Sequence, residues 1–328
     1  MPNRSRIAAV IGNGIIGHGI AEILAKAGWM VKLIGRNAAS LDGARENIIL
    51  SLTEFVNAGL LTSEAMGGAL SRLSLSTQIA DAVRAELIFE AVPEDMELKR
   101  SIFAELDQIC DPEAILASSS GHPVSALDTR VTRKERVVAA HFWYPPQLMP
   151  LVEVCGSPST HPVVIERVCR ALKAAGKEPV VIDHELPGFV GNRIQFAALR
   201  EAWSLWAAGY ATAEAIDAIV RNSIGRRLAV TGPIESADIG GLDTMFHFAS
   251  FLQPYLDVSK EPPERIKMLV TAGHRGASNG KGVREWGEGE AQDLMFKRRR
   301  ELVRWLKDDQ SDSAREDDGR RADHSSVT

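Results

Sequence analysis

The 328-residue sequence has few cysteines and no long apolar run. Its three cysteines, Cys110, Cys155 and Cys169, stand too far apart for a metal-binding or redox motif, so we interpret them as packing residues in a reducing compartment and predict no metal site. No stretch of about eighteen apolar residues occurs, which argues against a membrane-spanning helix. The chain also opens without an apolar signal-peptide core, and we therefore expect a cytoplasmic location.

The sequence has no excess of positive charge. Lys and Arg number 38 against 43 Asp and Glu, for a net charge of −5, which argues against nucleic acid as the main partner. With 45% apolar and 25% charged residues the composition is typical of a globular enzyme and excludes a disordered chain or a coiled-coil rod. Residues 308–328 hold almost nothing apolar, and we predict a disordered charged tail there.

The order of apolar segments predicts two domains before that tail. Over residues 1–183, short apolar runs typical of buried strands alternate with amphipathic helical stretches, which predicts an α/β Rossmann-type doubly wound domain. Over residues 184–307 every strong pattern has helical period and no convincing strand occurs, which predicts an all-α C-terminal domain.

A glycine-rich turn follows the first predicted strand. The segment Gly12-Asn13-Gly14-Ile15-Ile16-Gly17 matches the dinucleotide-binding fingerprint, and a helix opens directly after it. In that fingerprint the first glycine permits the turn, the second lets the backbone approach a pyrophosphate, and the third lets helix and strand pack closely. The alternative is a glycine turn without a ligand. The context favours an NAD(P) site formed by all six residues.

The second half of the fingerprint is altered. An acidic residue is expected at the end of the second strand to bind the ribose hydroxyls, but the chain has Gly35-Arg36-Asn37 there. A guanidinium can pair with a 2′-phosphate that a carboxylate would repel. Arg36 therefore favours NADP. The alternative is that Arg36 stacks on the adenine while NAD binds.

A histidine and a glutamate occupy two consecutive predicted strands. His141 lies where an apolar strand ends, and Glu153 lies within the next apolar strand, where an unpaired carboxylate would be costly. If the strands are neighbours, Glu153 can fix the imidazole tautomer and leave the other ring nitrogen to exchange a proton with an alcohol. From the residues alone, a purely structural His–Glu pair is equally plausible.

Several motifs together resemble the L-3-hydroxyacyl-CoA dehydrogenase family, and more narrowly its branch of lambda-crystallin, L-gulonate 3-dehydrogenase and carnitine dehydrogenase. They are the glycine turn, residues 89–94, residues 117–120, the segment from His141 to Glu153, residues 188–195 and residues 232–243. The resemblance implies an NAD(P)-dependent oxidoreductase that interconverts a 3-hydroxy acid and its 3-keto form. It also implies that the helical domain over residues 184–307 binds substrate and forms the dimer.

The resemblance also assigns roles to single residues. It makes His141 the general acid/base and Glu153 its orienting partner. It makes Ser120 and Asn192 the groups that bind the reacting oxygen, and it places Glu94 and Lys99 near the cofactor. Without it, Ser120 would be interpreted as a turn residue and Asn192 as a helix cap.

Two features bear on the substrate. The family has asparagine three residues after the histidine, where this chain has Tyr144, and the prolines at 145, 146 and 150 resemble the branch that acts on free polar hydroxy acids. We therefore expect a small, polar substrate that is not a thioester. The alternatives are an L-3-hydroxyacyl-CoA, an imine, or, in another class, a catalytically inactive nucleotide-binding protein with a structural or sensing role.

Two tryptophans mark a face of the first helix in the second domain. Trp203 and Trp206, three residues apart, share one side of this helix, which the family uses at its subunit interface. Core packing within the domain is the alternative. We expect a homodimer formed through the helical domain.

Overall fold

The computed structural model describes residues 6–325, and side chains up to residue 311. It separates into two compact units. The first comprises the chain up to Phe189 together with the segment from Arg299 onward, and the second is Val190–Arg298. The boundaries expected at 183/184 and 307/308 differ from these. The first division comes later, after Phe189. The second falls within the long C-terminal helix, whose start groups with the second unit and whose continuation groups with the first.

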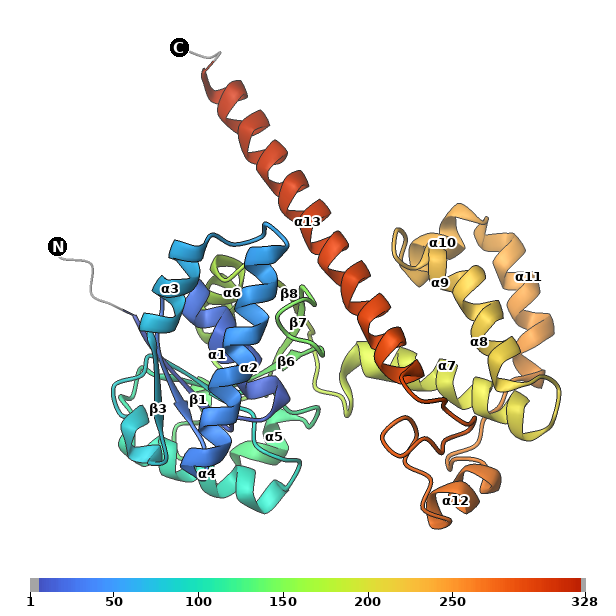
Figure 1. Cartoon of the computed structure of the whole chain (residues 1–328), viewed down its shortest axis with the longest axis horizontal. Helices are drawn as coiled ribbons and strands as arrows, with labels where there is room; N and C mark the ends of the chain where they lie inside the picture. Colours follow the sequence, from blue (N-terminus) through green and yellow to red (C-terminus); the bar gives the residue numbers. More distant parts are fainter. Residues whose placement is uncertain (1–5, 326–328) are drawn as a thin grey trace. The chain divides into compact units, whose positions relative to one another are not determined.

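The first unit contains one eight-stranded sheet in the order β3-β2-β1-β4-β5-β6-β7-β8 (Figure 1). Neighbouring strands are parallel except β6 and β7, which are antiparallel. The strands are β1 Ile7–Ile11, β2 Met30–Ile34, β3 Leu73–Ser76, β4 Leu87–Glu90, β5 Ile115–Ser118, β6 Val137–Phe142, β7 Leu151–Gly156 and β8 Glu178–Val181. The order from β3 to β6 is that of a Rossmann sheet, which confirms the predicted fold class.

Helices cover both faces of this sheet, and each face has its own core. The helices are α1 Ile15–Lys26, α2 Ala38–Asn57, α3 Ser63–Ser71, α4 Met96–Ile109, α5 Val124–Leu127 and α6 Pro162–Ala174. Short 3-10 turns lie at Ile79–Ala82, Asp128–Arg130 and Lys134–Arg136. One core joins α1, α2, α3 and α6 to alternate strand residues, and the other joins α4 and α5 to the remaining ones. Both faces are therefore buried, which explains the continuous apolar strands.

The second unit is helical, as predicted. It contains most of α7 Phe189–Ala207, then α8 Ala213–Asn222, α9 Ile224–Arg227, α10 Pro233–Ile239, α11 Leu242–Leu252, a 3-10 turn at Gln253–Tyr255, and α12 Glu264–Thr271. Within the described part of this unit, β pairing is limited to two isolated bridges that share Lys281. No helix in residues 6–325 is both long enough and apolar enough to cross a membrane.

The last helix, α13, runs from Glu290 to Ser325. The sequence predicted a disordered tail over residues 308–328, whereas the structure continues the helix through this stretch, and residues 326–328 lie outside the described residues. Arg304 lies 3.0 Å from Asp308 one turn later, an ion pair that supports the helix at this point. No proline follows Pro263 to interrupt it.

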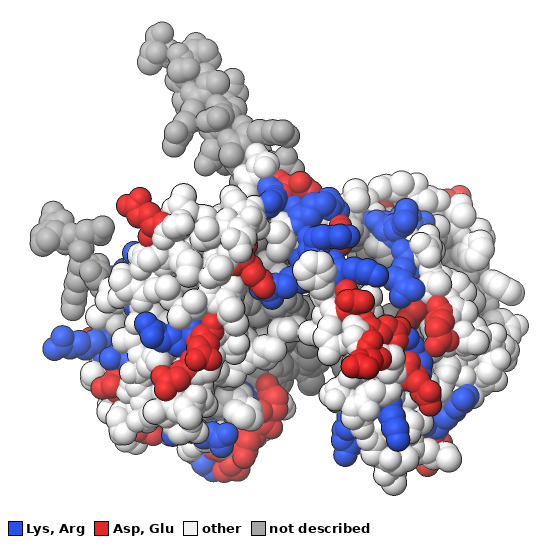
Figure 2. Space-filling view, viewed as in Figure 1, with Lys and Arg blue, Asp and Glu red and all other residues white. Residues whose placement is uncertain are grey.

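Charges of both signs are interspersed on the surface of the first unit. On the face drawn in Figure 2, its Lys and Arg side chains lie among Asp and Glu side chains, and neither sign forms a continuous field. Basic side chains gather more densely along α13, where Lys297–Lys307 holds six bases and one acid.

Candidate active site

The glycines after β1 have three different structural environments. Gly12 has φ +106°, and a side chain there would lie 2.5 Å from the Ala91 carbonyl oxygen at the end of β4. At Gly17 a Cβ would lie 1.9 Å from the Gly12 carbonyl oxygen, so only glycine lets α1 pack against the turn. At Gly14 a Cβ would meet no atom within 4 Å. The turn is thus closed at its base and open at Gly14.

The start of α1 offers an anion site at that open position. Gly14 is the N-cap and supplies no side chain to bond the first N–H groups, and the first turn contains no acidic residue. The N–H groups and the helix dipole there suit a pyrophosphate. Ile15 is exposed, whereas Ile16 packs against the core of the first unit. The residues present therefore fit a dinucleotide cofactor, and the backbone at Gly14 to Ile16 would hold its phosphates.

The end of β2 lies beside the same turn. The Asn13 side chain lies so close to Gly35 that a Cβ at residue 35 would meet its Oδ1 at 2.6 Å. Asn37 caps α2 by accepting a hydrogen bond from the Ser40 backbone N–H at 2.8 Å. Arg36, between them, is exposed. The position expected to hold the ribose-binding acid therefore presents an exposed guanidinium next to a helix N-terminus.

His141 and Glu153 are direct partners across the antiparallel pair β6–β7. The Nδ1 atom of His141 lies 2.9 Å from Oε2 of Glu153, and both side chains are largely buried. The indole N–H of Trp143 also donates to Oε2, at 3.1 Å. A carboxylate accepts from Nδ1–H, which places the proton on that nitrogen and leaves Nε2 to act as an acceptor. The pair thus has the geometry of an oriented general base.

Phe189 packs against the flat face of the His141 imidazole. Its ring stacks on His141 with centroids 5.1 Å apart and planes 6° from parallel, and it is 2% exposed. Its φ of +54° is in the left-handed region, directly after Gly188 at +83°. Sequence reasoning recognised the segment 188–195 but gave Phe189 no role. Its position beside a glycine in that motif was the available signal.

Ser120 lies in a polar cluster at the end of β5. Its Oγ lies 2.8 Å from Oε2 of Glu94 and 2.9 Å from Nδ1 of His122. Lys99, fully buried, donates to Glu90 at 2.8 Å and to the Val92 carbonyl at 3.0 Å, and its ammonium lies 3.8 Å from Glu94. Lys99 therefore holds the loop that carries Glu94, through its hydrogen bond to Val92, and places its charge on the buried side of the cluster. His122 was not predicted.

Asn192 lies in the first turn of α7, in the second unit. It follows Phe189 by three residues, so one short segment carries both the ring that stacks on His141 and this amide. Its role toward a substrate stays a prediction.

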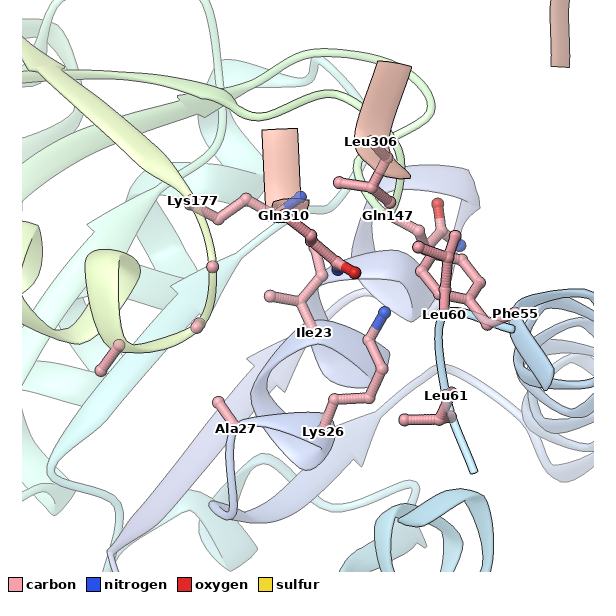
Figure 3. A pocket seen from close by; sticks show the side chains of 13 residues that line it. Ile23, Lys26, Ala27, Phe55, Leu60, Leu61, Gln147, Lys177, Leu306 and Gln310 are labelled. Carbon is pink, nitrogen blue, oxygen red and sulfur yellow. The ribbon is translucent and has the colours of Figure 1, made fainter. Parts of the chain in front are cut away.

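The loop between His141 and Glu153 is anchored by a buried lysine. The Nζ of Lys177, in the turn before β8, donates to the carbonyls of Pro146 at 2.6 Å and Met149 at 3.0 Å. Burial, with the nearby charge of Lys26 adding to it, lowers the pKa of Lys177 to about 7. Both lysines line a cavity of about 230 Å³ beside α1, closed in part by Leu306 of α13 (Figure 3).

The helix α1 contacts the same loop. A Cβ at Gly19 would lie 2.4 Å from Pro146, so α1 and the loop after His141 touch directly. Glu22 of α1 is fully buried, and its burial raises the pKa of its carboxyl, with Lys26 3.4 Å away opposing that shift. The lysine-lined cavity is thus separate from the polar cluster at Ser120 but shares the loop with His141.

Two family models together match the chain from residue 7 to residue 286. The NAD-binding domain of 3-hydroxyacyl-CoA dehydrogenase matches residues 7–186, and the C-terminal domain of the same family matches residues 188–286. The boundary between them lies at residue 187, close to where the two units divide after Phe189.

Curated relatives agree with these models. The 3-hydroxyadipyl-CoA dehydrogenase of Escherichia coli is 34% identical over 85% of this chain, which spans 58% of that protein's length. The 5-formyl-3-hydroxy-2-methylpyridine 4-carboxylate 5-dehydrogenase of Mesorhizobium japonicum is 32% identical over 91% of this chain and 96% of the relative. Lambda-crystallin of Oryctolagus cuniculus is 35% identical over 78% of this chain and 79% of the relative.

A solved structure gives the same result. The crystal structure of 5-formyl-3-hydroxy-2-methylpyridine 4-carboxylic acid 5-dehydrogenase, an NAD⁺-dependent dismutase, has a TM-score of 0.85 and 30% identity, over 92% of this chain and 99% of that one. The predicted resemblance, including the lambda-crystallin branch, is confirmed. The chain belongs to the 3-hydroxyacyl-CoA dehydrogenase family of NAD-dependent oxidoreductases.

Proposed function

We propose that the protein interconverts a small, polar 3-hydroxy acid, not a thioester, with its 3-keto form. The observation that carries the acid/base chemistry is the contact between Nδ1 of His141 and Glu153 at 2.9 Å, supported by Trp143 and Phe189. The choice of a free polar acid rests on Tyr144 and the prolines at 145, 146 and 150. A nicotinamide cofactor, when bound, supplies the hydride acceptor or donor for this reaction. Everything else in the chemistry comes from the chain's own side chains.

In the oxidation direction His141 acts as the general base. Its Nε2 accepts the proton of the substrate hydroxyl, and the resulting imidazolium is stabilised by Glu153 at Nδ1. Ser120, and Asn192 on α7, donate hydrogen bonds to the reacting oxygen. In the reverse direction the imidazolium returns the proton to that oxygen. The backbone at Gly12 to Gly17 holds the cofactor phosphates, while Glu94, with Lys99 beneath it, lies at the edge of the same site.

The substrate panel that tests this proposal contains free 3-hydroxy acids and matching CoA thioesters. We expect turnover of free acids, followed by the absorbance of the reduced nicotinamide, and its loss in His141→Asn. The matched control is His161→Asn, because His161 caps α6 and asparagine caps equally well. Turnover confined to thioesters would instead support an L-3-hydroxyacyl-CoA dehydrogenase, the reaction class that the name of the E. coli relative suggests.

An absence of turnover with every hydroxy acid and thioester in the panel, despite cofactor binding, would support the third reading, an inactive nucleotide-binding protein. A set of imines extends the panel, because the same acid/base pair could serve their reduction. Cofactor binding is measured separately by calorimetry.

We further propose that the cofactor preference leans toward NADP. Arg36 supports this, since it is exposed at the end of β2 where an acid would bind the ribose hydroxyls of NAD. The matched family model is an NAD-binding domain, so this proposal concerns only the relative affinity of the protein for NADP and NAD.

We also propose a homodimer formed through the helical unit. Its α10 and α11 expose a group of large apolar side chains that a second copy could cover, namely Ile234, Ile239, Leu242, Phe246, Phe248 and Phe251. Light scattering on the purified protein tests this, and a monomeric mass at micromolar concentration would contradict it.

A cytoplasmic location is the last part of the proposal. The three cysteines are free thiols, and burial raises the pKa of Cys110 and Cys155 to about 11, so both stay protonated and suit a reducing compartment. Fractionation of cells that produce the protein would test it.

A further inference from the structure

His122 lies inside the polar cluster at Ser120 without any part in the mechanism above. It follows Ser120 by two residues, in the turn between β5 and α5. Its Nδ1 lies 2.9 Å from Oγ of Ser120 and 3.1 Å from Oε2 of Glu94, and these two oxygens are 2.8 Å apart. Three polar atoms from three residues therefore form a closed triangle. The hydroxyl in it is buried, whereas the imidazole and the carboxylate are half-exposed.

The hydrogens available to this triangle can be counted. A carboxylate oxygen only accepts, so Nδ1 of His122 must carry a hydrogen in order to sit 3.1 Å from Glu94 without repulsion. Ser120 has a single hydroxyl hydrogen, which it donates to Glu94. Its oxygen also accepts from the backbone N–H of His122 at 3.2 Å. In this arrangement the hydrogen of Ser120 is committed to Glu94.

That commitment conflicts with the proposed role of Ser120, which must donate to the reacting oxygen of the substrate. If Ser120 turned away, Glu94 Oε2 would lose its 2.8 Å donor. Lys99 cannot replace it closely, because its ammonium is bonded to Glu90 and Val92 and remains 3.8 Å from Glu94. The Nδ1–H group of His122 is the other donor within hydrogen-bond distance in this cluster.

We propose that His122 is a positioning residue that holds the Glu94 carboxylate through Nδ1–H and so frees the hydroxyl hydrogen of Ser120 for the reacting oxygen. The inference rests on the proposed function, which makes Ser120 a substrate-binding residue. It assigns to His122 the task of satisfying Glu94 while Ser120 is turned to the substrate. A hydrogen bond to a charged carboxylate is among the stronger kinds, so Nδ1–H of His122 keeps a protein donor on Glu94 when Ser120 turns to the substrate.

The test uses two substitutions of different chemistry. His122→Asn keeps a side-chain N–H near the place of Nδ1, whereas His122→Leu keeps the bulk and removes the donor. We expect His122→Leu to lower kcat by about tenfold, the effect of weakening one hydrogen bond made in the transition state, with the KM for the cofactor unchanged. His122→Asn should restore kcat to within about threefold of the wild type, and His161→Asn should leave it unchanged.

A double-mutant cycle separates positioning from a general structural effect. In a Ser120→Ala background there is no hydroxyl to direct, so His122→Leu should have little further effect on kcat. If His122→Leu lowered kcat by the same factor with and without Ser120, or had no effect in the wild type, the inference would be overturned.

A measurement on the substrate-free protein keeps this inference separate from the proposed function. The ¹⁵N shifts of the His122 ring report which nitrogen carries the proton. We expect hydrogen on Nδ1, and a switch of tautomer in Glu94→Gln. A bare Nδ1 in the wild type would contradict the inference even if hydroxy acids are turned over, whereas failure of turnover with hydrogen on Nδ1 would contradict only the proposed function.

Discussion

Phe189 lies parallel to the imidazole of His141, with ring centroids 5.1 Å apart. The contact joins the first residue of α7 to a residue near the end of β6. These two segments meet on the face of the sheet that α4 covers. Glu153 holds the imidazole at Nδ1 and Phe189 holds its flat face, so the ring is restrained both in its plane and out of it.

The stack predicts a specific effect of Phe189→Leu. Removing an aromatic pair should lower the free energy of unfolding by about 1 kcal/mol or more and should lower kcat several-fold, because the imidazole can then tilt. The matched control is Phe142→Leu. This substitution also removes an aromatic pair, since Phe142 contacts Phe89 with ring centroids 5.6 Å apart, but the pair packs in the core on the opposite face of the sheet. Equal losses of kcat in the two variants would contradict a specific role for the Phe189 stack.

The glycine turn predicts different outcomes for two alanine substitutions. Gly17→Ala places a methyl group against the Gly12 carbonyl and should strongly destabilise the first unit, seen as a lower melting temperature. Gly14→Ala meets nothing within 4 Å, so it should fold normally and raise the KM for NAD, because the methyl enters the space of the phosphates. A Gly14→Ala protein with unchanged KM would place the cofactor elsewhere.

Arg36 predicts the direction of a cofactor switch. The wild type should bind NADP at least as well as NAD, and Arg36→Asp should lower kcat/KM for NADP by about tenfold or more while improving that for NAD, since a carboxylate repels the 2′-phosphate and can accept from ribose hydroxyls. Asn37→Asp is the control for an added acid at the helix cap. A wild type that strongly prefers NAD would show that Arg36 has only a packing or stacking role.

Lys177 predicts a pH-dependent contribution to stability. Burial lowers its pKa in the folded protein to about 7, from 10.5, so the unfolded chain binds more protons between these values and the free energy of unfolding rises with pH across that window. Lys177→Met removes this slope and also the two hydrogen bonds to the loop. The stability advantage of the wild type over Lys177→Met should therefore grow from about pH 7 to about pH 9 in urea titrations.

The control for Lys177 is Lys173→Met, an exposed residue one turn earlier in the chain. Its difference from the wild type should stay constant with pH. If the Lys177→Met difference were equally constant, Lys177 would retain its ordinary pKa and the burial argument would be incorrect.

The sequence predicted most of the fold because its signals are local and periodic. The alternation of buried strands with helices could be identified directly, since both faces of the sheet are covered and its central strands are mainly apolar. The helix α3 at Ser63–Ser71 was missed because only Ala69 among its residues is buried, which leaves little amphipathic pattern. The extension of α13 beyond residue 308 was missed because the charged, apolar-poor composition of residues 308–328 predicted disorder, although Arg304 and Asp308 have the spacing of a helical ion pair.

For the site, the sequence determined which chemical groups are present and in what order along the chain: the glycine turn, Arg36, Ser120, His141, Glu153 and Asn192. Only the tertiary structure decided which side chains touch. The antiparallel register of β6 and β7 sets Glu153 opposite His141. The burial of Phe189 in a core of the first unit brings its ring onto the same imidazole, and the turn after β5 turns His122 back onto Ser120 and Glu94. Such contacts depend on register and on side-chain direction, which residue types and spacing along one chain do not specify.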